Sequence, residues 1–162
     1  MTPSSQVYNV RRSILAFLIA GLIDIAVTTP EDARFDTDSV ASFVRVQIRD
    51  LATQDQRVDG GQIGWRTTLV LDCECYAKTT DNAEEIDLSA AYLIGDQVTD
   101  LVRVAPGRGS SIPVLDWAGD PEADPTAELQ YLRTLPSPTL PPIEGWQRRI
   151  VSFVFNYRSI AG

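Results

Sequence analysis

The strongest constraint on the fold is a long stretch of alternating residues from Trp65 to Ala77. Leu69, Leu71, Cys73 and Cys75 occupy one phase of the alternation, and mostly polar residues occupy the other. A period of two places successive side chains on opposite faces of a β-strand. About thirteen residues at 3.3 Å each reach roughly 43 Å, which is long for a strand in a small domain. We therefore predict a β-ribbon whose Gly60–Arg66 end projects beyond the core.

Other hydrophobic patterns predict two helices and several further strands on either side of this ribbon. In chain order they are a helix over about Ser5–Leu22 capped by Ser4 or Ser5, a strand Ile23–Thr28, a strand Phe43–Arg49, a hairpin connection Asp55–Gly61, the ribbon, a helix Asp87–Val104 that could begin at Asp81, and strands Glu128–Leu135 and Arg149–Tyr157. The Phe43 strand is expected to pair antiparallel with the ribbon, since a Gly-rich turn separates them.

Side-chain patterns indicate which faces these elements bury. The second helix carries an apolar stripe of Ala91, Ile94, Val98, Leu101 and Val102. In the strand at Glu128–Leu135, the alternation places Leu129, Tyr131 and Leu135 on one face. The last strand is mostly apolar on both faces, which is typical of a central strand.

These elements predict one α+β domain spanning residues 1–162. Its sheet is expected to be mixed, mainly antiparallel, with about 4–6 strands flanked by two main helices. Loops are expected near residues 31–39 and 105–127. A stiff connector is expected over residues 136–142, because Pro136, Pro138, Pro141 and Pro142 cannot join a sheet interior.

The charge balance disfavours a generic nucleic-acid surface. The chain has a formal net charge of −8 and a pI of about 4.4, whereas binding to phosphates needs clustered Lys and Arg. Thirteen arginines accompany a single lysine, Lys78. That bias suits ordered ion pairs at interfaces, although a GC-rich genome would produce it as well.

The sequence lacks the residues that several kinds of catalytic and metal-binding site need. The chain has no histidine, so the commonest neutral-pH base and metal ligand is missing. Cys73 and Cys75 are predicted to be small buried hydrophobes, because a zinc site would lack further ligands. Residues 107–111 lack the lysine and glycine spacing of a phosphate loop. The acidic residues from Asp116 to Asp124 do not match an EF-hand. We predict no catalytic residues, no cofactor and no metal.

The apolar run Ile14–Ile23 follows Arg11 and Arg12, which is the order found in a signal peptide. The run is too short to span a bilayer, and helical spacing already extends upstream of it. We predict a buried helix and no membrane association, with the signal peptide as the alternative.

The order of elements resembles the tail terminator, or tail completion, proteins of long-tailed bacteriophages. The matching segments are Ile14-Leu15-Ala16-Phe17-Leu18, Phe43-Val44-Arg45-Val46-Gln47-Ile48, Leu71-Asp72-Cys73-Glu74-Cys75-Tyr76-Ala77, Ala90-Ala91-Tyr92-Leu93-Ile94-Gly95-Asp96-Gln97-Val98, and Trp146 through Tyr157. The resemblance covers most of the chain as an architectural pattern.

This resemblance implies a structural protein of the virion, assembled in the host cytoplasm. Such proteins form hexameric rings that cap the tail tube, end its polymerisation and face the head–tail connector or neck protein. Double-stranded DNA passes through the central hole without specific binding. An acidic lumen would let the duplex slide, where a basic one would hold it.

Candidate subunit or partner contacts are Arg45, Arg49, Trp65, Arg66, Asp116 and Asp120. Two other functions stay open. The first is a head-completion or neck protein on the portal side. The second is a small ligand-binding or enzymatic domain, in which Asp72 and Glu74 on one strand face would form a carboxylate pair; such a pair needs a cleft with differently tuned environments.

Overall fold

The computed structural model describes residues 3–32, 34–58, 62–78, 89–103, 111–125, 127–138 and 140–159. Its elements are α1 (Pro3–Gly21), β1 (Ala26–Thr28), the 3-10 turn η1 (Thr37–Ser39), β2 (Ser42–Val58), β3 (Gln62–Lys78), α2 (Ser89–Arg103), β4 (Ser111–Val114), β5 (Ala127–Leu135) and β6 (Trp146–Ser159). The strands form one mixed sheet in the order β1-β2-β3-β6-β5-β4. The α+β fold predicted from the sequence is confirmed.

The long ribbon is strand β3, and it pairs antiparallel with β2 as expected. The register runs from Ser42 opposite Ala77 to Val58 opposite Gln62, with a β-bulge between Arg49 and Ala52. Strand β2 is therefore much longer than the predicted Phe43–Arg49 segment. Of the predicted hairpin connection Asp55–Gly61, residues 55–58 belong to β2 instead, and residues 59–61 lie outside the described residues.

Strands β3 and β6 lie at the centre of the sheet and supply most of its core. Leu69, Leu71 and Cys73 stand opposite Phe155, Phe153 and Val151, and all six side chains are buried. The predicted central position of the last strand is confirmed. Its length from Trp146 to Ser159 exceeds the predicted segment at both ends.

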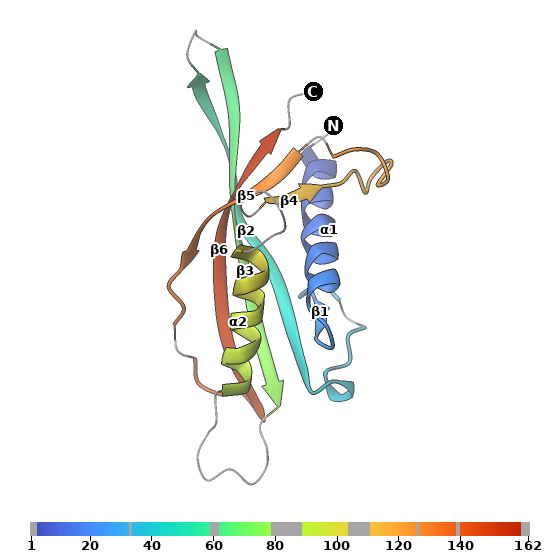
Figure 1. The fold of residues 1–162 in the computed structure, drawn as a ribbon, viewed down its shortest axis with the longest axis vertical. Coiled ribbons are helices and arrows are strands. Elements are labelled where there is room, and N and C mark those ends of the chain that lie inside the picture. Colours follow the sequence, from blue (N-terminus) through green and yellow to red (C-terminus); the bar gives the residue numbers. More distant parts are fainter. Residues whose placement is uncertain are drawn as a thin grey trace.

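Both helices pack on the same face of the sheet (Figure 1). Helix α2 lies over the two central strands, and its predicted stripe is confirmed, with Ala91, Ile94, Val98 and Val102 buried. Helix α1 contacts both outermost strands, β1 and β4, because the sheet curls around it. The helices approach closely at Gly21, where a Cβ atom would lie 2.4 Å from the side chain of Leu101.

The start of the chain differs from the prediction in two details. Helix α1 begins at Pro3, so Ser4 and Ser5 lie inside it and are not its cap; proline suits the first helical turn, where its missing N–H is not needed. Strand β1 begins only at Ala26. Asp24 adopts a left-handed φ of 63°, which places a turn where the predicted strand would have begun.

The second half contains an element that the sequence did not predict. Residues 111–114 lie in the predicted 105–127 loop but form edge strand β4, with Ile112 and Val114 buried. Strand β5 matches the predicted Glu128–Leu135 segment, but the prediction that Leu135 shares a face with Leu129 and Tyr131 was wrong. A bulge between Tyr131 and Arg133 shifts the register, so Leu135 stands opposite Ser152, on the other face from Leu129.

Two further expectations concern the helices. The predicted starts of the second helix at Asp81 or Asp87, and its end at Val104, lie outside the described residues. Ile14 and Leu18, from the apolar run at the N-terminus, are fully buried in α1. Among the described residues, no helix combines the length and apolarity needed to cross a membrane.

Candidate assembly surfaces

The ends of β2 and β3 extend past the rest of the sheet as a two-stranded arm (Figure 1). We define the arm as residues 54–58 of β2 and 62–66 of β3, which pair with each other from Gln54–Arg66 to Val58–Gln62. The pairing of β3 with β6 begins only at Thr67. At about 3.3 Å per residue the arm extends roughly 17 Å beyond the last β3–β6 pair. Trp65 and Arg66, two predicted contact residues, lie in this arm.

The outer edge of β2 is the second feature available for contacts. Strand β1 covers only Phe43, Val44 and Arg45, and within the described part of the sheet no strand pairs with β2 beyond Arg45 on this side. An open strand edge presents backbone N–H and C=O groups that can pair with another chain.

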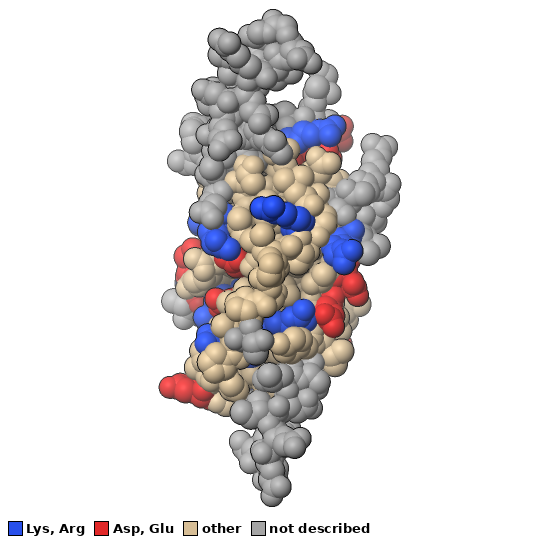
Figure 2. Space-filling model, turned by 90° about the vertical axis from the view of Figure 1, so that its left-hand side faces the viewer, with Lys and Arg blue, Asp and Glu red and all other residues tan. Residues whose placement is uncertain are grey.

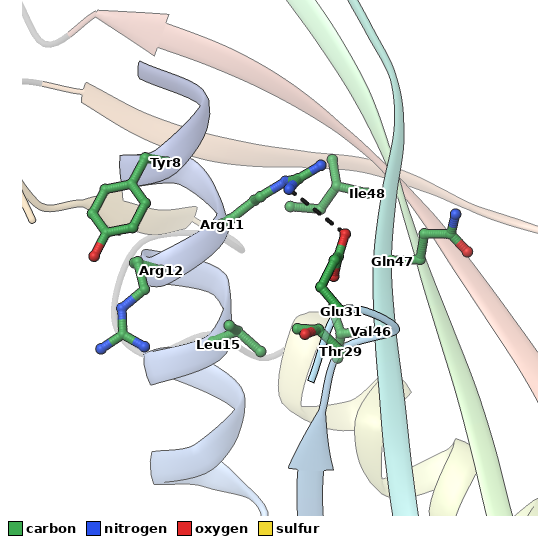
Figure 3. A pocket seen from close by; sticks show the side chains of 9 residues that line it. All are labelled: Tyr8, Arg11, Arg12, Leu15, Thr29, Glu31, Val46, Gln47 and Ile48. Carbon is green, nitrogen blue, oxygen red and sulfur yellow. Dashed lines mark ion pairs between the residues drawn. The ribbon is translucent and has the colours of Figure 1, made fainter. Parts of the chain in front are cut away.

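A pocket of about 270 Å³ lies between α1 and this edge (Figure 3). Its walls come from α1, from the segment after β1 and from β2, through Tyr8, Arg11, Arg12, Leu15, Thr29, Glu31, Val46, Gln47 and Ile48. Arg11 reaches toward Glu31 with an Nη1–Oε1 distance of 3.8 Å. Both side chains are exposed, so this ion pair adds little stability. The inner lining of Leu15, Val46 and Ile48 is aliphatic and suits an apolar side chain.

The face of the sheet away from the helices carries an aromatic cluster. Phe43 and Tyr76 are stacked, with ring centroids 4.6 Å apart, and Trp146 meets Phe43 edge-on at 5.1 Å. Arg45 lies over both stacked rings, with its guanidinium carbon 5.8 Å from the Phe43 centroid and 5.6 Å from that of Tyr76. These distances are typical of cation–π contacts.

Arg45 and Arg49, both predicted contact residues, share this face but differ in their surroundings. The Nε of Arg45 is buried and has no hydrogen-bond acceptor among the described residues. Arg49 instead donates from Nε to the carboxylate of Asp72, which also accepts a hydrogen bond from Ser152. Figure 2, viewed from the left of Figure 1, shows Lys and Arg side chains spread along that side, with Asp and Glu side chains toward both edges of the view.

The carboxylates Asp72 and Glu74 lie on one strand face as predicted, but each has its own structural partner. Asp72 binds Arg49 and Ser152, whereas Glu74 accepts a hydrogen bond of 2.8 Å from the hydroxyl of Tyr76. Burial, followed by the bond to Glu74, raises the pKa of Tyr76.

The acidic loop, residues 115–125, is fastened to helix α1. The buried side chain of Asn9 accepts a hydrogen bond from the Ala118 N–H and donates one to Asp116, at 2.9 and 3.2 Å. The hydroxyl of Ser13 accepts hydrogen bonds from the Leu115 N–H and the Trp117 indole. The carboxylate of Asp120, a predicted contact residue, accepts from the Glu122 N–H and shapes the loop. Asp116 thus has an intramolecular role that the sequence did not indicate.

Cys73 and Cys75 are both free thiols with buried side chains, so the predicted packing role is confirmed. Burial raises the pKa of Cys75 to about 12 and that of Cys73 well above its usual range. Neither thiol is therefore a ready nucleophile, because the thiolate is the reactive form.

Within the described ranges no group of three or more Asp, Glu, Cys or His side chains is arranged to hold a metal ion. Comparison with protein-family models and with curated proteins finds no match to this chain.

Proposed function

We propose that this protein is a structural ring subunit of a bacteriophage tail, acting as a tail terminator. In this role identical copies would cap the tail tube, end its polymerisation and face the head connector while DNA passes through the ring. The proposal begins from the resemblance of the element order to that family. Features of the fold that favour assembly over catalysis support it.

The observation that carries the proposal is the arm. A two-stranded ribbon without a third strand is marginally stable in water. Residues 54–58 and 62–66 nevertheless continue the β2–β3 ladder past the sheet. A ribbon of this kind gains stability when a neighbouring subunit supplies further contacts. The open edge of β2 lies on the same strand, so the arm and the edge offer one continuous surface to a partner.

The net charge supports the same role. A chain with a charge of −8 repels the phosphates of a duplex on average. Copies arranged around a hole would therefore let DNA slide through without holding it. Location in the virion, and in the host cytoplasm during assembly, follows from this proposal.

The test is direct observation of rings. The purified protein should give hexamers by native mass spectrometry, or rings by negative-stain electron microscopy, either alone or after incubation with tail tubes. Tailless heads serve as the parallel sample. Binding to heads and not to tubes would favour the neck-protein alternative, and a stable monomer that joins neither particle would overturn the proposal.

An armless variant links the test to the structure. Gln54 and Arg66 face each other in the register. Replacing residues 55–65 by Asn-Gly therefore connects them through a two-residue hairpin turn. We expect this variant to stay folded, with a cooperative thermal unfolding transition like that of the wild type, and to lose ring formation. Rings formed equally well without the arm would show that the arm is not the assembly element.

A further inference from the structure

Three cations border the aromatic cluster on the face of the sheet away from the helices, where Phe43 and Tyr76 are themselves buried and Phe35 packs against Phe43. We define the basic patch as Arg45, Lys78 and Arg148. Arg45 lies over Phe43 and Tyr76, and Lys78 lies over Trp146, with its Nζ 5.6 Å from the ring centroid. Arg148 stands directly opposite Tyr76 in the β3–β6 register. The patch is continuous because all three cations border the same group of rings.

The charges of this patch are only partly balanced. Among the described residues none of the three cations forms an ion pair with a carboxylate. Arg148 donates from Nε to the Pro141 carbonyl, and Lys78 donates to the Asp38 carbonyl. Glu74 is the carboxylate nearest in register, opposite Arg45, and it is engaged by Tyr76. The three cations thus outnumber Glu74, the carboxylate that faces them in the register of the described strands.

The acidic loop has the complementary charge and a fixed shape. Asp120, Glu122 and Asp124 are exposed at its surface. Its backbone is anchored to α1 by the buried side chains of Asn9 and Ser13. An anchored loop loses little conformational entropy when it binds, so more of the charge attraction is retained as affinity.

The two surfaces lie on opposite sides of the sheet. The loop is held by α1, which packs on one face, whereas the basic patch is on the face away from both helices. A protein with complementary surfaces on opposite sides associates head to tail, and such contacts close into rings when the rotation allows it.

We propose that the acidic loop of one copy of this chain docks on the basic patch of the next. This inference rests on the proposed ring and names the contact that would close it. Two copies of net charge −8 repel each other overall, as the chain repels DNA. A second copy is nevertheless the better fit, because its anchored loop presents three carboxylates on a fixed backbone of complementary charge, whereas a duplex carries phosphates along its whole length. The attraction between charged surfaces should make ring formation sensitive to salt.

A reciprocal charge exchange tests the contact. In the patch variant, Lys78→Glu and Arg148→Glu reverse the charge and leave Arg45 in its aromatic packing. In the loop variant, Glu122→Lys and Asp124→Lys reverse the charge, while Asp120→Asn keeps the oxygen that accepts from the Glu122 N–H. Each variant alone should require about tenfold more protein to form rings.

Mixing the two variants should restore assembly, because each reversed surface then meets an oppositely charged neighbour. Native mass spectrometry should show rings with equal numbers of both variants. A control with Asp32→Lys and Asp100→Lys, which lie at exposed positions outside both surfaces, should assemble like the wild type. Circular dichroism of every variant separates loss of folding from loss of assembly.

The outcomes distinguish the two proposals. If wild-type protein forms no ring, the proposed function fails. If wild-type rings form and either variant alone assembles equally well, the loop–patch contact is wrong while the ring stands. The same conclusion follows if the folded variants do not rescue each other.

A DNA-binding measurement completes the test. Fluorescence anisotropy with a labelled 20-base-pair duplex would detect binding at physiological salt. Binding that the patch variant abolishes would assign the patch to nucleic acid and overturn the contact.

Discussion

The amide of Asn9 and the carboxylate of Asp116 are joined by a hydrogen bond of 3.2 Å across 107 positions of sequence. The same Asn9 side chain accepts from the Ala118 N–H, so one residue of α1 fixes two points of the acidic loop. Its exposed fraction is 1%. The Asn9 amide is therefore costly to leave unpaired, whereas its loop partners Asp116 and Ala118 lie nearer the surface, where water can replace part of what they lose.

We predict that Asn9→Leu lowers the free energy of unfolding by about 1–3 kcal/mol, because the Ala118 N–H and Asp116 lose their buried partner. Urea denaturation monitored by tryptophan fluorescence measures the change. Gln97→Leu, at an exposed position of α2, is the matched control and should change stability by less than about 0.5 kcal/mol. Equal stability of Asn9→Leu and wild type would show that the loop is not held through this amide.

Arg149 joins β6 to α2 and provides the second prediction. Its Nη1 donates to the Tyr92 carbonyl and to Asp96, and its guanidinium carbon lies 4.6 Å from the centroid of the Tyr92 ring. Arg149→Met keeps the aliphatic stem and removes these bonds, so we expect a loss of about 1–3 kcal/mol by urea denaturation. Arg158→Met, on the same strand but exposed, should cost less than about 1 kcal/mol. A larger loss of stability for Arg158→Met than for Arg149→Met would contradict the role assigned to Arg149.

The two cysteines should be inert in the folded protein. Both are free and buried, and burial raises the pKa of each thiol. At pH 8 we expect labelling by an aromatic disulfide reagent to be slow in buffer and complete within minutes in concentrated urea. Rapid labelling of native protein would mean that this part of β3 opens easily.

The same thiols predict how stability depends on pH. Below pH 9.0, the ordinary pKa of the thiol, folded and unfolded chains both keep the proton. Between pH 9 and about 12 the unfolded chain loses it while the folded chain retains it, so stability falls as pH rises, by about 1.4 kcal/mol per pH unit for each thiol. The raised pKa of Tyr76 acts in the same direction.

Urea denaturation at pH 8, 9, 10 and 10.5 measures this slope. Cys75→Ala should show a shallower fall than wild type, because one of the two thiols no longer contributes. Identical slopes for the two proteins would show that the Cys75 thiol does not titrate differently on unfolding.

The arm gives a prediction that separates assembly from folding. Trp65 lies in the part of β3 beyond the pairing with β6, so Trp65→Ala should weaken ring formation more than it weakens folding. Trp146→Ala is the informative comparison, because Trp146 packs against Phe43 and Tyr76 and should cost about 3 kcal/mol of stability. Unchanged ring formation by Trp65→Ala would show that Trp65 is not part of the subunit contact.

The sequence predicted the elements whose pattern is long and regular. The alternation in β2, β3 and β6 predicted their faces, and the apolar stripe of α2 predicted its buried side, because burial repeats along these elements. Strand β4 was missed since Ile112 and Val114 flank a proline in only four residues, too short a run to show a period. Leu135 was placed on the wrong face because the extra residue of a bulge leaves no clear mark in composition.

The candidate contact residues were likewise predictable only in part. Alternation along the strand alone is enough to place Arg45 and Arg49 on one face. Their different surroundings depend on register, which brings Asp72 beside Arg49 and Tyr76 beneath Arg45. The contact of Asn9 with Asp116 joins residues that no local pattern relates. Long-range pairing of this kind is decided by the whole fold.

The curled sheet also has a consequence for the order in which the protein folds. Helix α1 precedes every strand of the sheet along the chain, yet it touches β4 as well as β1. Its packing therefore cannot be completed until β4 has also left the ribosome, and β6 emerges later still. Contacts that close such long loops form slowly, because chain entropy is lost before they stabilise anything. The apolar side of α1 therefore lacks its contact with β4 until that strand has been made, and an exposed apolar helix face is prone to aggregation during that interval.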